Sequence, residues 1–114
     1  MQMIKLSIDF SKINNVTEFH DEMKELFGFP DFYGKNAHAL IDCLTSLRYP
    51  EDGMTSINIG KDDYILLEVS NIKYHENDSE MTKILFSSIQ FVNYRCNFMG
   101  DNPSILLSLT QSCH

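Results

Sequence analysis

A short, almost continuously apolar segment constrains the fold more than any other feature of this sequence. The segment is YILLEVS, Tyr64 to Ser70, and turn-forming residues precede it. A run of this length and composition is typical of a strand buried on both faces, as in a parallel sheet. Parallel strands need crossover connections, which are usually helical. The segment therefore predicts an α/β fold.

Two further strands are predicted on either side of this segment. Residues 3–9 alternate apolar and polar side chains in strict order, and residues 104–110 repeat the short apolar pattern. Thr55, Ile57 and Ile59 alternate only weakly, so they predict at most a short edge strand.

Helical patterns fill the connections between these strands. The first helix is expected to begin at Asn15, with Glu18 completing a capping-box-like start, and to stop at Gly28. A second helix is predicted within residues 32–47, and a third begins near Ser79, with Ser79 itself as the N-cap. The element order predicts one small domain, residues 1–114, in which a three-stranded parallel sheet packs with three to four helices.

Composition excludes several classes of function. Sixteen acidic residues against nine basic ones give a net charge of −7, which argues against direct binding of nucleic-acid phosphates and allows steering toward a basic partner. No apolar stretch approaches the roughly 20 residues that span a bilayer. The three cysteines show no metal-type spacing, and the N-terminus shows no signal-peptide pattern, so we expect a cytoplasmic protein.

The helix predicted within residues 32–47 has two distinct faces. Its apolar stripe is the natural core face and contains Ala37, Leu40, Leu44 and Leu47. The opposite stripe contains His38, Asp42 and Thr45, with Ile41 near the boundary. Taken alone, such a polar face is more often solvated surface than a functional site.

The sequence offers little support for an enzyme. Cys43 and His38 are five positions apart, which separates them by roughly 140° around a helix and prevents a nucleophile–base pair. No common catalytic motif is present, and no cofactor is expected. A metal site built from His20, His38, His75 and His114 stays open as an alternative, although scattered histidines are usually surface residues.

The segment FPDFYGKNAHALIDCLTSL, residues 29–47, resembles the signature of the barstar family of intracellular ribonuclease inhibitors. The resemblance extends more weakly to residues 65–69 and 105–109. It implies an immunity protein or antitoxin that neutralises a cognate bacterial nuclease toxin by plugging its active site. Asp42 would then enter the basic pocket that holds substrate phosphate. The expected partner-binding residues are Phe32, Tyr33, Gly34, Asn36, His38, Ile41, Asp42 and Thr45.

Departures from the family pattern point to a different target. His38 stands where the family's best-known member has a second acid, and Ile41 stands where it has a tryptophan. We therefore expect a nuclease other than that member's target. The alternative is a protein-interaction module on the same scaffold that binds a non-ribonuclease toxin or a regulatory partner, with the loop Arg48 to Asp63 as its contact. Cys43 and Glu68 are expected to have structural roles.

Overall fold

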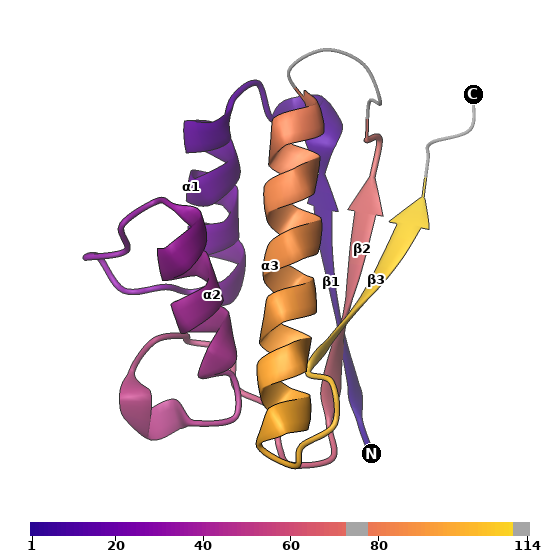
Figure 1. Ribbon diagram of the computed structural model, residues 1–114. Helices are drawn as coiled ribbons and strands as arrows, with labels where there is room; N and C mark the ends of the chain where they lie inside the picture. The colour runs from indigo at the N-terminus through magenta and orange to yellow at the C-terminus, as the bar shows by residue number, and fades with distance from the viewer. Residues whose placement is uncertain (73–77, 111–114) are drawn as a thin grey trace.

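A computed structural model describes residues 1–72 and 78–110 of the chain. It contains the predicted three-stranded parallel sheet and three α-helices (Figure 1). The elements in chain order are β1 (Met3–Asp9), η1 (Phe10–Lys12), α1 (Val16–Phe27), α2 (Ala37–Thr45), η2 (Pro50–Asp52), β2 (Tyr64–Ser70), α3 (Asp78–Phe98) and β3 (Ile105–Thr110). None of the helices in the described part combines the length and apolar character needed to cross a membrane.

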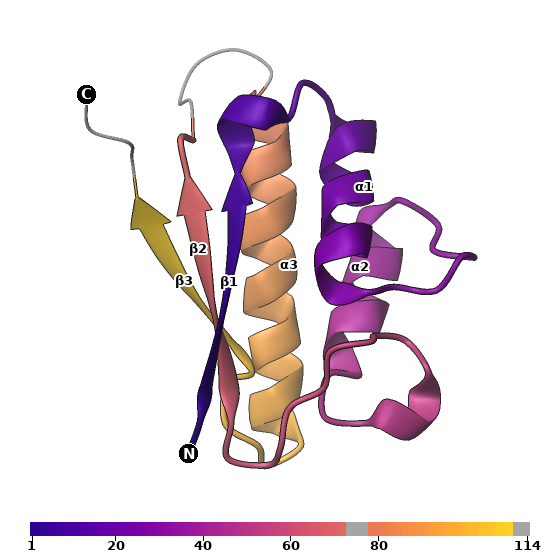
Figure 2. The ribbon, with the colours of Figure 1, turned by 180° about the vertical axis from the view of Figure 1, so that it is seen from behind.

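The sheet has the strand order β1-β2-β3, with helices on one face (Figures 1 and 2). Both crossovers step across the sheet in the same direction, and parallel crossovers are right-handed, so they place their helices on the same side. The prediction that Tyr64–Ser70 is buried on both faces is therefore wrong. Ile65, Leu67 and Val69 are buried beneath the helices, whereas the alternate residues of β2 are only half-buried.

Glu68 lies on the face of the sheet that the helices leave open. Its Oε1 atom lies 2.6 Å from Nζ of Lys5 on the neighbouring strand, and its side chain is partly exposed. The structural role expected for Glu68 is confirmed, since the carboxylate is paired in the middle of a strand rather than buried alone.

The sequence signals for α1 are confirmed at both ends. The side chain of Asn15 accepts a hydrogen bond from the backbone N–H of Glu18 at 2.9 Å, and Glu18 accepts from the N–H of Asn14 at 3.0 Å. Gly28 ends the helix in the left-handed region, with φ of 70°. A Cβ atom at Gly28 would lie 2.4 Å from Cβ of Ser56, so close packing also requires glycine there.

Two local predictions are wrong. Ser79 lies inside α3, which begins at Asp78, so Ser79 is not the N-cap. The segment 55–59 forms no strand. Its backbone instead bonds to the last residue of α1 and to Leu47, two residues after α2. The N–H of Ser56 donates to the carbonyl of Phe27 at 3.0 Å, and the N–H of Ile59 donates to the carbonyl of Leu47 at 3.0 Å.

Arg48, in the loop after α2, bonds to the segments that precede β2 and β3. Its guanidinium donates to four backbone carbonyls, those of Asn102 at 2.7 Å, Asp63 at 2.9 Å, Gly60 at 3.2 Å and Pro103 at 3.4 Å. The planar, multiply donating guanidinium suits this bridge between two loops, where a lysine would not. The role of Arg48 is therefore structural.

His20 is part of the core, contrary to its expected place among the surface histidines. It is buried in α1, and its Nδ1 atom lies 2.5 Å from the hydroxyl oxygen of Tyr33. Burial lowers the pKa of His20, Asp21 opposes that shift, and Lys35 adds to it. The neutral imidazole is therefore the form that the fold favours.

We expect the stability of the protein to fall as the pH drops below about 6.5, the ordinary pKa of histidine in an unfolded chain. Because the pKa of His20 is lowered in the folded state, the unfolded state binds the proton first, and stability present above that pH is lost on acidification. Urea unfolding at pH 7.5 and 5.5 measures the loss.

The His20→Gln variant removes the titrating group and should reduce the difference between the two pH values. The matched control is His38→Gln, because His38 is exposed on α2. An equal pH dependence in the wild type and His20→Gln would contradict the assignment.

Candidate functional site

The loop that leads into α2 is shaped by its own polar side chains. The side chain of Asn36 caps α2 by accepting a hydrogen bond from the N–H of Ala39 at 2.8 Å, and it donates to the carbonyl of Gly34 at 3.2 Å. Lys35 has a φ of 52° and forms an ion pair with Asp21 at 2.8 Å. Asn36 therefore fixes the start of the helix, a role the predicted binding surface did not include.

The aromatic pair before α2 is split between surface and core. Phe32 is 75% exposed, whereas Tyr33 is only 6% exposed. The Tyr33 ring packs against Phe29, with ring centroids 4.8 Å apart, and its hydroxyl bonds to His20. Tyr33, one of the expected partner-binding residues, is therefore buried and does not share the exposed surface with Asp42. Tyr33 holds the loop to α1, and Phe32 is the aromatic side chain that the loop presents.

The polar face predicted for α2 is present. His38 and Asp42 are exposed, and Ile41 and Thr45 are half-buried. The opposite face is anchored by Leu40, Leu44 and the following Leu47, all fully buried. Thr45 turns its hydroxyl toward the carbonyl of Ile41, at 2.6 Å. The side chain of Asp42 is 66% exposed and is the acidic group on this face.

Arg95, a residue that the sequence analysis missed, lies beside Asp42. Its Nη1 atom lies 3.2 Å from Oδ1 of Asp42 and 3.2 Å from Oγ1 of Thr45. The two helices run side by side (Figure 1), so a residue 53 positions further along the chain joins the α2 face. The pair is largely exposed, so it contributes about 0–1 kcal/mol to stability.

A row of exposed aromatic residues continues the surface along α3. Phe91 lies beneath the guanidinium of Arg95, with Cζ 5.1 Å from the ring centroid, and packs edge-on against Tyr94. Phe98 and Met99 lie further along, both exposed. Phe91, Tyr94, Arg95 and Phe98 have the spacing i, i+3, i+4, i+7, which is a helical stripe. That spacing was the available sequence signal for this second face of α3.

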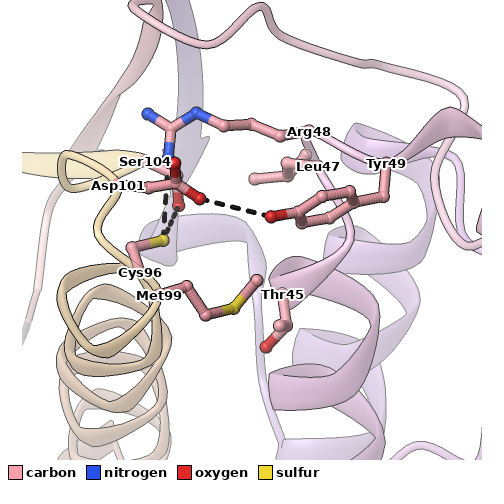
Figure 3. A pocket seen from close by; sticks show the side chains of 8 residues that line it. All are labelled: Thr45, Leu47, Arg48, Tyr49, Cys96, Met99, Asp101 and Ser104. Atoms are coloured by element: carbon pink, nitrogen blue, oxygen red, sulfur yellow. Dashed lines mark hydrogen bonds between the residues drawn. The ribbon is translucent and has the colours of Figure 1, made fainter.

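The small cavity between α2, α3 and the loop after each is not a ligand site (Figure 3). Its volume is about 10 Å³, room for at most one water molecule. Its walls are tied together, since the Tyr49 hydroxyl donates to Asp101 at 3.2 Å and the Cys96 thiol donates to Ser104 at 3.6 Å. The cavity is therefore a small void between packed elements.

Of the two α2 residues considered as a nucleophile–base pair, Cys43 is buried and His38 is exposed. Cys43 is buried, and burial, with a smaller contribution from Asp42, raises the pKa of its thiol to about 11. Its expected structural role is thus confirmed, because the thiolate is the nucleophilic form. Within residues 1–72 and 78–110, no three metal-ligating side chains come together. His75 and His114, two members of the alternative metal site, lie outside the described residues.

Comparison with known proteins agrees with the resemblance noted in the sequence. The family described as Barstar (barnase inhibitor) matches residues 3–90, more than half of the chain. A curated relative in Bacillus subtilis (strain 168), named "Putative ribonuclease inhibitor YrdF", is 46% identical over 43 residues. That match covers 38% of this chain and 47% of the relative, so it spans about half of the relative's length. On the family match, this chain belongs to the Barstar (barnase inhibitor) family.

Proposed function

We propose that this chain binds and inhibits a ribonuclease, and that Asp42 is the group that enters the enzyme's active site. The observation that carries the proposal is the exposed carboxylate of Asp42 on the outer face of α2, within a family of barnase inhibitors. α2 is capped at its start and buried along its other face, so the carboxylate is presented from a rigid element.

The chemistry of a ribonuclease pocket explains why a carboxylate fits. Such a pocket gathers cationic and hydrogen-bonding groups that stabilise the charge of the RNA phosphate. A carboxylate accepts the same charge-assisted hydrogen bonds but offers no bond to cleave. Asp42 would therefore occupy the phosphate position without being turned over.

The residues around Asp42 would form the contact surface. Phe32 projects from the loop, Gly34 and Asn36 shape the approach to the helix, and His38, Ile41 and Thr45 surround the carboxylate. Tyr33 would act indirectly, because its buried ring positions the loop. The net charge of −7 would accelerate association with a basic enzyme. The protein would thus protect the cell that makes it from its own nuclease toxin.

One observation favours a partner of different chemistry as a second candidate. Arg95 partly neutralises Asp42, which weakens the carboxylate as a mimic of a phosphate. A partner that is not a ribonuclease, or a toxin that does not cut nucleic acid, would bind the Asp42–Arg95 pair. Such binding would not depend on mimicry of a phosphate.

Asp42→Ala should weaken ribonuclease inhibition by at least about 100-fold, because it leaves the cationic groups of the pocket buried without a partner, at a cost of about 3 kcal/mol or more. The measurement is cleavage of a fluorogenic RNA by barnase and by any toxin domain found encoded immediately upstream of this chain, titrated with purified protein. Thermal unfolding of the variant should match the wild type, since the Asp42–Arg95 pair is exposed.

The matched control is Glu80→Ala, which changes the net charge equally. Glu80 is exposed on α3, fifteen residues before Arg95 and therefore about 22 Å away along the helix. Full inhibition by Asp42→Ala would rule out the assigned role of Asp42. A stable complex with an upstream toxin that cuts no RNA would instead support the second candidate.

If the exposed His38 faces a cationic pocket, its imidazolium form is repelled, so affinity for the ribonuclease should weaken on acidification. Binding of the wild type and of His38→Gln, measured by calorimetry from pH 5.5 to 8, separates this contribution from titrating groups of the enzyme. Identical pH profiles for the two proteins would exclude the contact.

A further inference from the structure

The exposed face of α3 beside Asp42 carries a concentration of large apolar side chains. Phe98 is 82% exposed, Tyr94 is 61% exposed and Phe91 is 48% exposed, and Met99 lies next to them. Together with Arg95 these residues line an open groove of about 350 Å³. Single exposed apolar residues are common, but a contiguous group of this kind marks an interaction surface. We call these five residues the α3 groove.

The α3 groove is physically continuous with the Asp42 face of α2. Arg95 joins them, because its guanidinium bonds to Asp42 and Thr45 and also lies over the ring of Phe91. A partner that covers Asp42 must therefore meet Arg95, and through Arg95 the aromatic residues. The two helices also lie side by side, so one partner surface can cover both (Figure 1).

The charge of the chain favours a basic partner over a second copy as the occupant of the α3 groove. Two copies would each bring a net charge of −7 into the same interface, whereas a basic enzyme drawn to Asp42 arrives with the opposite sign. Exposed aromatic side chains beside a charged anchor supply contact area at a small cost in conformational entropy.

From these contacts we infer that the α3 groove is the second half of the inhibitory surface, and that it binds an apolar segment of the ribonuclease adjoining its basic pocket. Asp42 then selects for cationic pockets in general, and the groove selects among ribonucleases by the shape of that apolar segment. The family match covers residues 3–90 and ends immediately before Phe91. The inference rests on the proposed function.

The variants Tyr94→Ala, Phe98→Ala and the double variant test the inference. Their partner is a catalytically inactive form of the ribonuclease that the protein inhibits in the RNA-cleavage assay. Binding is measured by surface plasmon resonance. The double variant should lose about 10- to 100-fold in affinity, mostly through faster dissociation. The controls are Leu106→Ala and Met3→Ala, which shorten apolar side chains on the sheet that are 44% and 48% exposed. The controls should bind as the wild type does, and all five variants should unfold at a similar temperature.

The outcomes separate this inference from the proposed function. Loss of binding in Asp42→Ala with wild-type affinity in the double α3 variant would overturn the assigned role of the α3 groove. The inhibitory role of Asp42 would then stand alone. No binding of the wild type to barnase or to the upstream toxin domain would overturn both. Sedimentation that shows a wild-type dimer, converted to a monomer by the double variant, would assign the groove to self-association and overturn its role in binding the enzyme.

Discussion

Parallel pairing of β2 with both of its neighbours is the constraint on which the rest of this structure depends. Parallel strands cannot be joined by a tight turn, so each connection must return along the sheet as a helical crossover. Both crossovers step in one direction from β1 to β3, and their common handedness places α1, α2 and α3 on one face. The surface that carries Asp42 is therefore the outer side of a single helical layer.

Within that layer, the position of the loop before α2 depends on a buried polar contact. The hydroxyl of Tyr33 reaches His20 inside the core, and Phe29 packs against the same ring. Asn36 then starts the helix in a fixed direction. The buried contact and the cap leave Phe32 and Asp42 on the surface, so the exposed chemistry depends in part on the buried residues Tyr33 and His20.

The site also shows how charged side chains from two helices that are distant in sequence can form one surface. Asp42 alone would be a simple anionic group, but Arg95 makes it half of a mixed pair and connects it to the aromatic residues of α3. Under the proposed function, such a surface would combine a long-range attraction for basic partners with short-range shape selection. This combination separates the chain from a purely acidic inhibitor surface.

The sequence by itself determined the strands and helices, the caps of α1, the core and polar faces of α2 and the exposure of Asp42, because these follow from local periodicity and from side chains that bond within a few residues. It also carried the resemblance to the Barstar family, which the family match then showed. Only the tertiary structure decided that β2 is covered on one face, that Tyr33 turns inward to His20, and that Arg95 reaches Asp42. The physical reason is that each of these depends on elements far apart in the chain, and a local pattern specifies which face of an element is apolar but not which neighbour covers it.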